Sequence, residues 1–356
     1  MTIETRFSCS ALASCAATLL LAVSLSPAAA QQGYRLEMAT TLPSTDTGWD
    51  YLEFDAAKSH LYIAHRADGM QVFDVKAQKV IKTLDNSVGA NSVTLVPEFD
   101  RGYVANQDGT TTVFELSTLK TLDRFKVDDD LNANFYEPTT KRVIFTSAER
   151  PTTSRMVSLD AKTGKVVHTM EVDGKKIDNP AVDRRGNIYV PLRDKNMMLR
   201  VNAQDLKIMA TWPMTPCDAP ASFDIDKANR RLLLGCRLTK PVFIAMDADT
   251  GKVVASLPIG RNVNALFYDS ETKRILTSNG ADASLTVIEQ QNADHYRVLE
   301  DVSTRPGARM MAYDQKTKKA YVVTAEFTVI PPTSGTGAPR TVFFPNTFVV
   351  LTYAVK

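Results

Sequence analysis

A recurring segment restricts the fold of this chain more than any other feature of its sequence. The sequence DAKTGKVVHTMEV (160–172) returns as DADTGKVVASLPI (247–259), 87 residues later. Near the midpoint, NAQDLKIMATWPM (202–214) has the same order of polar turn, basic residue and alternating apolar run. A recurrence at about half of that offset indicates a repeat architecture, in which each unit buries its apolar face against the next.

The polar turn in each unit gives the spacing of the repeat. Its anchor residues lie 41, 45, 42, 45 and 42 residues apart: Asp74, Glu115, Asp160, Asn202, Asp247 and Glu289. Each unit holds four short alternating runs, as in NVNALFYDS, KRILTSNG, ASLTVIEQ and HYRVLEDV. Such runs between Asp, Asn, Gly or Lys turns are typical of antiparallel strands. Repeated four-strand units predict an all-β fold, a β-propeller with four-stranded antiparallel blades.

Copies of the outermost-strand pattern give the number of blades. There are seven: YRLEMATTL (34–42), KVIKTL (79–84), KTLDRFKV (120–127), KVVHTMEV (165–172), LKIMATWPM (206–214), KVVASLPI (252–259) and YRVLEDV (296–302). The first copy precedes any complete blade, and the last blade ends at its third run, FVVLTYAVK. We therefore predict a seven-bladed propeller over residues 31–356, with the N-terminal strand completing the C-terminal blade and removing an exposed sheet edge.

The repeat also carries a family resemblance. The stretches YVAN (103–106), YVVT (321–324) and DADTGK (247–252) recur in similar positions of their units. They resemble the bacterial YVTN-repeat propellers, the YncE-like group, over about residues 34–356. The resemblance implies a seven-bladed propeller in a secreted or periplasmic protein, and it implies nucleic-acid binding for some members. Its motifs are turn and packing residues, so it implies a fold and leaves the function open.

The N-terminal residues have a different composition from the repeat. A short polar start containing Arg6 precedes an Ala- and Leu-rich stretch that ends in Ala28, Ala29 and Ala30. This order predicts a secretory signal peptide, residues 1–30, cleaved after Ala30. The alternative is a membrane anchor, but the apolar stretch is short for a span and ends in small residues. We therefore expect a periplasmic or secreted protein with no membrane span after cleavage.

Two cysteines remain outside the predicted signal peptide, Cys217 and Cys236. Cys217 precedes a predicted first strand and Cys236 ends the next strand of the same blade. Antiparallel neighbours bring those two ends to one side, and an exported protein is exposed to oxidising conditions. We predict a structural disulfide between them; the alternative is a pair of free thiols.

Motifs for cofactor chemistry are absent from the sequence. It contains no Cys-x-x-Cys-His, no Gly-x-Ser-x-Gly and no Walker-type loop. Its histidines, His60, His65, His168 and His295, do not pair at metal-ligand spacing. We therefore expect no cofactor and no metal, and we assign no catalytic residue.

Polar residues recur five positions before the residue that ends each predicted first strand. Across the blades, these positions hold Asp50, Asn91, Leu131, Asp178, Ala221, Asn264 and Arg309. First strands line the axis of a propeller, so the positions form a ring at the mouth of one face. We predict that Asp50, Asn91, Asp178, Asn264 and Arg309 bind a polar ligand there. The alternative is a solvated mouth without a ligand.

The ends of the predicted second strands lie near the same mouth. They supply His65, Arg66, Arg193 and Arg237, which are suited to bind an anion or carboxylate. Ordinary solvated loop charge is the alternative.

An insertion, EFTVIPPTSGTGAPRTVFFPNT (326–347), separates the second and third strands of the last blade. Its Pro, Gly, Ser and Thr residues predict a loop, in which Phe343 and Phe344 cover the mouth, contact a partner or pack against the blade edge.

These observations leave three functional hypotheses. The leading one is a monomeric, exported, non-enzymatic propeller that binds a partner protein or a small polar ligand at its axial face. The second is a lactonase- or isomerase-type enzyme, in which Asp50, Asp178, His65 and Arg309 converge on one substrate. The third is single-stranded nucleic-acid binding, which requires a basic groove with stacking aromatic residues. The net charge of +2 gives little support to this third hypothesis.

Overall fold

The computed structural model describes residues 1–5, 33–332 and 339–356. The predicted signal peptide therefore lies outside the described residues except for its first five, and its cleavage stays a prediction. Gly33–Lys356 form one contact unit. No helix among the described residues has the length and apolar character needed to cross a membrane.

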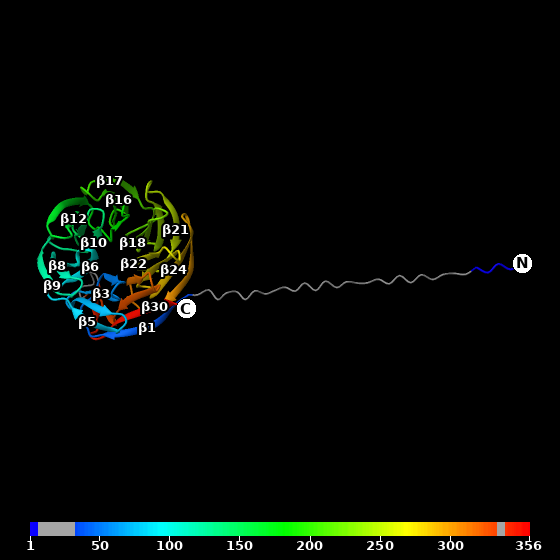
Figure 1. The fold of residues 1–356 in the computed structure, drawn as a ribbon, viewed down its shortest axis with the longest axis horizontal. Helices are drawn as coiled ribbons and strands as arrows, with labels where there is room; N and C mark the ends of the chain where they lie inside the picture. The colour runs from blue at the N-terminus through cyan, green and yellow to red at the C-terminus, as the bar shows by residue number, and fades with distance from the viewer. Residues whose placement is uncertain (6–32, 333–338) are drawn as a thin grey trace. The chain divides into compact units, whose positions relative to one another are not determined.

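Seven four-stranded antiparallel sheets surround a central axis (Figure 1). We number the blades 1 to 7 in chain order of their innermost strands. The innermost strands are β2 (Leu52–Asp55), β6 (Ala90–Val96), β10 (Ala133–Glu137), β14 (Ala181–Val182), β18 (Pro220–Asp226), β22 (Val263–Asp269) and β26 (Met310–Asp314). The second strands are β3 (His60–His65), β7 (Arg101–Asn106), β11 (Arg142–Thr146), β15 (Asn187–Leu192), β19 (Arg231–Cys236), β23 (Arg274–Asn279) and β27 (Lys319–Thr324). A short 3-10 helix, Pro97–Phe99, links β6 to β7.

The outer half of each blade completes the predicted pattern. The third strands are β4 (Gly69–Asp74), β8 (Thr110–Glu115), β12 (Thr153–Asp160), β16 (Met197–Asn202), β20 (Val242–Asp247), β24 (Ser284–Asn292) and β30 (Phe348–Val355). The outermost strands are β5 (Lys79–Thr83), β9 (Thr121–Lys126), β13 (Val166–Asp173), β17 (Ile208–Pro213), β21 (Val253–Pro258), β25 (His295–Ser303) and β1 (Tyr34–Leu42). The prediction of seven four-stranded antiparallel blades is confirmed.

The ring closes through β1, as predicted. This strand pairs antiparallel with β30, from Tyr34 opposite Val355 to Leu42 opposite Phe348. Beyond that register, the backbones of Gly33 and Lys356 exchange hydrogen bonds of 3.2 and 3.0 Å. The first and last strands of the propeller therefore share one sheet, and β30 is not left as an exposed edge of blade 7.

The apolar core lies between the blades. Among the described residues, seven clusters of buried apolar side chains form, one at each contact between neighbouring blades. At the contact between blades 7 and 1, for example, Tyr321 and Val323 pack with Leu61, Ile63 and Phe73. Because the middle strands carry apolar residues on both faces, each blade supplies two contacts, and burial of these side chains is the main stabilising term of the ring.

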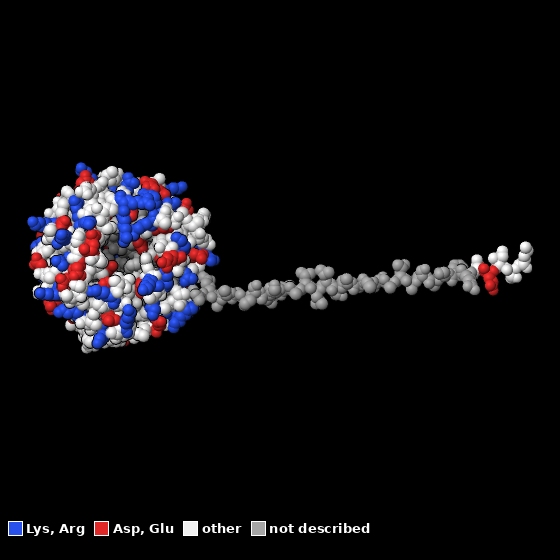
Figure 2. All heavy atoms as spheres, in the orientation of Figure 1, with Lys and Arg blue, Asp and Glu red and all other residues white. Residues whose placement is uncertain are grey.

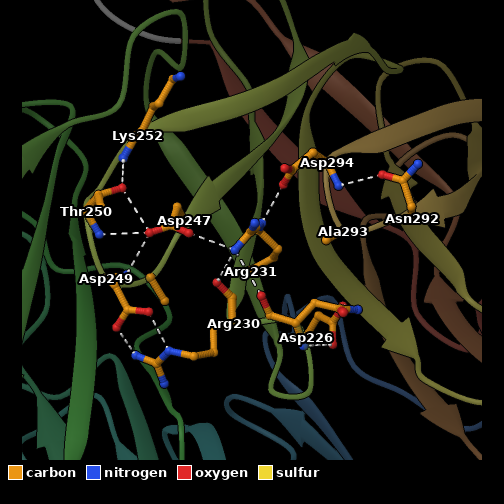
Figure 3. Close-up of polar contacts among 12 residues, drawn as sticks. Asp226, Arg230, Arg231, Asp247, Asp249, Thr250, Lys252, Asn292, Ala293 and Asp294 are labelled. Carbon is orange, nitrogen blue, oxygen red and sulfur yellow. Dashed lines mark hydrogen bonds and ion pairs between the residues drawn. The ribbon is translucent and has the colours of Figure 1, made fainter.

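Side-chain hydrogen bonds in the turns explain why this segment of the sequence recurs. Asp247 Oδ1 accepts hydrogen bonds from the backbone N–H of Asp249 (3.1 Å), the N–H of Thr250 (2.9 Å) and the Thr250 hydroxyl (2.9 Å). Asp160 makes the equivalent bonds 87 residues earlier. Figure 3 shows this turn, where Arg231 joins Asp247 (2.8 Å) to Asp294 of the next blade (2.7 Å). The repeated Asp-x-x-Thr-Gly-Lys motif is thus structural.

The insertion in blade 7 is more ordered than the sequence predicted. Its ends form a two-stranded sheet of β28 (Phe327–Ile330) and β29 (Arg340–Phe343). The prediction of a loop is wrong for these residues, because two runs rich in Phe, Val, Ile and Thr suit strands and pair with each other. The Gly-, Ser- and Thr-containing residues 333–338 lie outside the described chain.

Candidate functional site at the axial mouth

The innermost strands place the predicted ring residues around the axis. Asp50, Asp178 and Arg309 lie just before β2, β14 and β26, while Asn91 and Asn264 lie near the starts of β6 and β22. The backbone of Tyr51 donates to the carbonyl of Asn91 (3.1 Å), which fixes blade 1 against blade 2 at this level. Figure 2 shows one face of the molecule, which is hollowed near its centre and has both Lys or Arg and Asp or Glu side chains around the hollow.

Blade 3 contributes a different residue from the one expected. Its first strand ends at Glu137, so the residue five positions earlier is Asn132 and not Leu131. Leu131 is buried in the core between blades 2 and 3. The sequence prediction was shifted by one residue because Glu137 replaces the Asp that ends most first strands.

Asn132 organises the mouth between blades 2 and 4. Its backbone carbonyl accepts a hydrogen bond from Asn91 Nδ2 (2.7 Å), and its Oδ1 accepts one from Lys176 Nζ (2.9 Å). Lys176 is only 9% exposed. Sequence reasoning missed this lysine, although it stands two residues before Asp178 in the chain.

Four arginines join Lys176 at the mouth. Arg66 pairs with Asp50 at 3.0 Å, and Arg193 pairs with Asp178. Arg237 donates to Asn264 Oδ1 at 2.8 Å. The arginines come from four blades: Arg66, Arg193, Arg237 and Arg309.

Burial disfavours the charged forms of four cations at the mouth, namely Lys176, Arg193, Arg237 and Arg309. Burial, followed by the charge of Arg193, lowers the pKa of Lys176 to about 8. Burial, followed by the charge of Arg237, lowers the pKa of Arg193 to about 10. Burial is also the largest cause of the lowered pKa of Arg309 and Arg237. The pKa values of Lys176 and Arg193 are raised in part by two acidic neighbours, Asp50 and the exposed Glu149, and Arg193 also pairs with Asp178. Among the described residues, five cations therefore outnumber the carboxylates of Asp50, Asp178 and Glu149 and of Asp46, which borders the mouth beside Arg66 and Arg309. A bound anion would stabilise this arrangement.

His65 lies apart from this group. Its ring is fully buried and stacks on Phe348 with centroids 4.4 Å apart. Its Nδ1 lies 3.3 Å from Gln71 Oε1 and 3.4 Å from Asp68 Oδ2. These contacts tie His65 to the packing of blade 1 against blade 7. The set Asp50, Asp178, His65 and Arg309 therefore does not converge as the enzyme hypothesis requires.

Two carboxylates line the channel behind the mouth. Glu53 of β2 and Asp224 of β18 contribute to a cavity of about 200 Å³ that also borders Asn264 and Met310. Burial raises the pKa of Glu53 to about 7, and it also raises the pKa of Asp224. The charge at the mouth thus changes from cationic at the rim to acidic further along the axis. Among the described residues, no group of three or more His, Cys, Asp or Glu side chains is placed to hold a metal ion.

The two phenylalanines of the insertion have different surroundings. Phe343 packs against Trp49, with ring centroids 4.7 Å apart, and both side chains border the mouth. Phe344 is 44% exposed and lines a separate cavity of about 570 Å³. The insertion thus reaches the mouth through Phe343.

The predicted disulfide is present. Cys217 and Cys236 are bonded, with their Cα atoms 5.3 Å apart, and both side chains are buried in the core between blades 4 and 5. The bond ties the segment before β18 to the end of β19.

Comparisons with known proteins agree on the fold. No protein-family model matches the sequence, and no curated protein matches it. A chain in the crystal structure of the mitotic checkpoint complex is similar to this one, with a TM-score of 0.72 and 12% identity over 99% of both chains. The crystal structure of the RRP9 WD40 repeats has a TM-score of 0.72 and 7% identity over 90% of this chain and 100% of that one. At these identities the likeness shows the fold alone, a seven-bladed β-propeller.

Proposed function

We propose that this protein is a non-enzymatic binding protein whose axial mouth holds the anionic group of a small molecule. The observation that carries the proposal is the excess of cations there: five, namely Arg66, Lys176, Arg193, Arg237 and Arg309, face four carboxylates. Guanidinium and ammonium groups donate charge-assisted hydrogen bonds to carboxylate, sulfate or phosphate oxygens. After burial, repulsion from Arg193 and Arg237 lowers the pKa of Lys176, and repulsion from Arg237 lowers the pKa of Arg193. A bound anion relieves this repulsion.

The resemblance to the YVTN-repeat propellers also bears on where the protein is located. Together with the predicted signal peptide, it supports a periplasmic or secreted location for the protein. Fractionation of cells that express the full chain tests the location, and N-terminal sequencing of the product tests cleavage after Ala30.

Isothermal titration calorimetry with sulfate tests the proposed anion site. Sulfate keeps its charge across the neutral range, so any pH effect comes from the protein. We expect R237Q to weaken sulfate binding by tenfold or more, because Arg237 is a half-buried cation of the mouth. R297Q is the matched control, since Arg297 lies on the outermost strand β25 and pairs with Glu289. If the unmodified protein binds neither sulfate nor a carboxylate, the proposed function is wrong.

A further inference from the structure

A cavity lies between the axial mouth and the inserted hairpin. Its volume is about 460 Å³, within the range of small-molecule sites, about 300–1,000 Å³. Its lining combines three aromatic rings, from Trp49, Phe327 and Phe343, with two guanidinium groups, from Arg66 and Arg309. The carboxylate of the exposed Asp46 also borders the cavity, so the two guanidinium groups outnumber it. The two arginines belong to the anion site proposed above, whereas the aromatic rings do not.

The aromatic wall is built jointly by the propeller and the insertion. Phe343 of β29 lies 4.7 Å from Trp49 and 6.1 Å from Phe327 of β28, measured between ring centroids. Small residues make room for these rings: a Cβ on Gly48 would lie 3.3 Å from Phe343, and one on Gly307 would lie 3.1 Å from Phe327. Gly307 also has a φ of +78°, which disfavours any side chain there.

A glycine also makes room for the cationic part of the cavity. A Cβ on Gly280 would lie only 2.8 Å from Arg309 Cβ, so glycine at 280 allows Arg309 its position. Two buried donors lining the cavity, Arg66 Nε and Trp49 Nε1, have no hydrogen-bond partner among the described residues. Buried donors without partners are costly, and a ligand that supplies acceptor oxygens removes that cost.

We propose that this cavity binds a small organic monocarboxylate with an aromatic or branched aliphatic body. The carboxylate accepts hydrogen bonds from Arg66 and Arg309, while the apolar body packs against Trp49, Phe327 and Phe343. The inference deepens the proposed function and rests on it, because it names the chemical class of the anion. Inorganic anions satisfy the arginines but leave the aromatic wall exposed to water, so they bind less tightly.

Three probes separate the two parts of the proposed ligand. 3-Phenylpropanoate has both a carboxylate and a ring, propanoate lacks the ring, and 3-phenylpropan-1-ol lacks the charge. The chain has two tryptophans, so W212F leaves Trp49 as the fluorescent reporter of the cavity. We expect 3-phenylpropanoate to change Trp49 fluorescence and to bind at least tenfold tighter than either partial probe.

Variants assign the two contributions to residues. F343A removes part of the aromatic wall, so we expect it to weaken 3-phenylpropanoate by tenfold or more and to leave propanoate unchanged. R309Q is expected to weaken both acids and leave the alcohol unchanged, with R297Q again as the control. Circular dichroism checks that each variant is folded. If a variant fails to fold, the comparison of the three probes still tests the inference, because it uses a protein whose cavity residues are unchanged.

The outcomes separate this inference from the function beneath it. If sulfate binds but 3-phenylpropanoate binds no tighter than propanoate, the aromatic wall takes no part, and the inference is overturned while the anion site stands. If the alcohol binds as tightly as the acid, the arginines take no part in the cavity, which also overturns it. If sulfate and both acids fail to bind, the proposed function falls, and this inference falls with it.

Discussion

Burial and a bound anion have opposite effects on the pKa of Lys176. Its ammonium group donates to Asn132 but sits beside Arg193 and Arg237, with Asp50 and Glu149 as the nearby carboxylates. Burial and Arg193 lower its pKa to about 8, so the free protein keeps this proton at pH 7 and loses it in mildly basic solution. An anion at the mouth favours the protonated form and raises the pKa.

This linkage predicts a pH dependence of anion binding. Because the pKa of Lys176 in the free protein is about 8, the protonated form dominates at pH 7 and is the minor form at pH 9. The sulfate affinity should therefore fall by about tenfold between these pH values. Calorimetry at both pH values measures it.

Two substitutions assign this pH effect. K176M should bind sulfate more weakly at pH 7 and lose most of the pH dependence. K162M, which changes an exposed lysine in the turn between β12 and β13, should retain it. An unchanged pH profile in K176M would show that another group is responsible.

At the residue scale, the sequence located most of the mouth but not its contacts. Counting back five residues from the ends of β2, β6 and β26 gave Asp50, Asn91 and Arg309, because the chain from the mouth to the end of the strand has the same length in these blades. The count failed for blade 3, where Glu137 ends the strand. It also missed Lys176, which does not occupy the counted position, and it placed His65 at the mouth although an aromatic contact with Phe348 holds it in the core.

At the element scale, each blade carries a feature that the apolar pattern does not reveal. The register between the third and outermost strands shifts at least once in every blade, for example between Ala245 and Met246 or between Val72 and Phe73. Bulges of this kind increase strand twist and redirect side chains. A bulge adds one residue to a strand and shifts the alternation of apolar and polar residues by one position. The sequence pattern therefore predicted the outer strands but not their bulges.

The disulfide supports blade 5 and gives an element-scale prediction. Cys217 and Cys236 are 19 residues apart, so their bond restricts the unfolded chain and contributes about 3 kcal/mol on the chain-entropy model. The variant C217A/C236A should therefore have a free energy of unfolding about 3 kcal/mol lower, measured by urea denaturation. Alkylation without reductant should label neither cysteine in the unmodified protein. Labelling of both, with unchanged stability in the variant, would contradict the prediction.

At the scale of the whole molecule, the fold was the most predictable property. The repeat spacing, the four runs per unit, an unmatched outer strand at the N-terminus and a last blade without one left one arrangement, and the pairing of β1 with β30 confirms it. The site was less predictable, because its charges come from blades that are distant in sequence and meet only at the axis. The repeat sets the positions of the blades, whereas the residues at the mouth differ from blade to blade.

Closure by β1 predicts a strong effect of a short deletion. Removing residues 33–42 exposes the edge of β30 and the packing around Tyr353, so the protein should be lost from the soluble fraction or form oligomers. Size-exclusion chromatography measures this.

A rescue variant separates the position of the strand from its connection. Because Gly33 and Lys356 exchange hydrogen bonds, the deleted segment can be placed after Lys356 through an Asn-Gly turn, which suits a two-residue hairpin. This variant should be a monomer with the original circular dichroism spectrum. A folded, monomeric deletion variant would instead show that the ring does not need β1.

Closure of the ring also orders events during synthesis of the protein. The ribosome makes β1 before every other strand of the propeller, but its partner β30 is made last. Throughout that interval β1 has no neighbour within its own sheet, and its open edge is available to any other growing chain. Whether a nascent molecule becomes a ring or joins an aggregate is therefore decided by the eight residues of β30, after every other strand has been made.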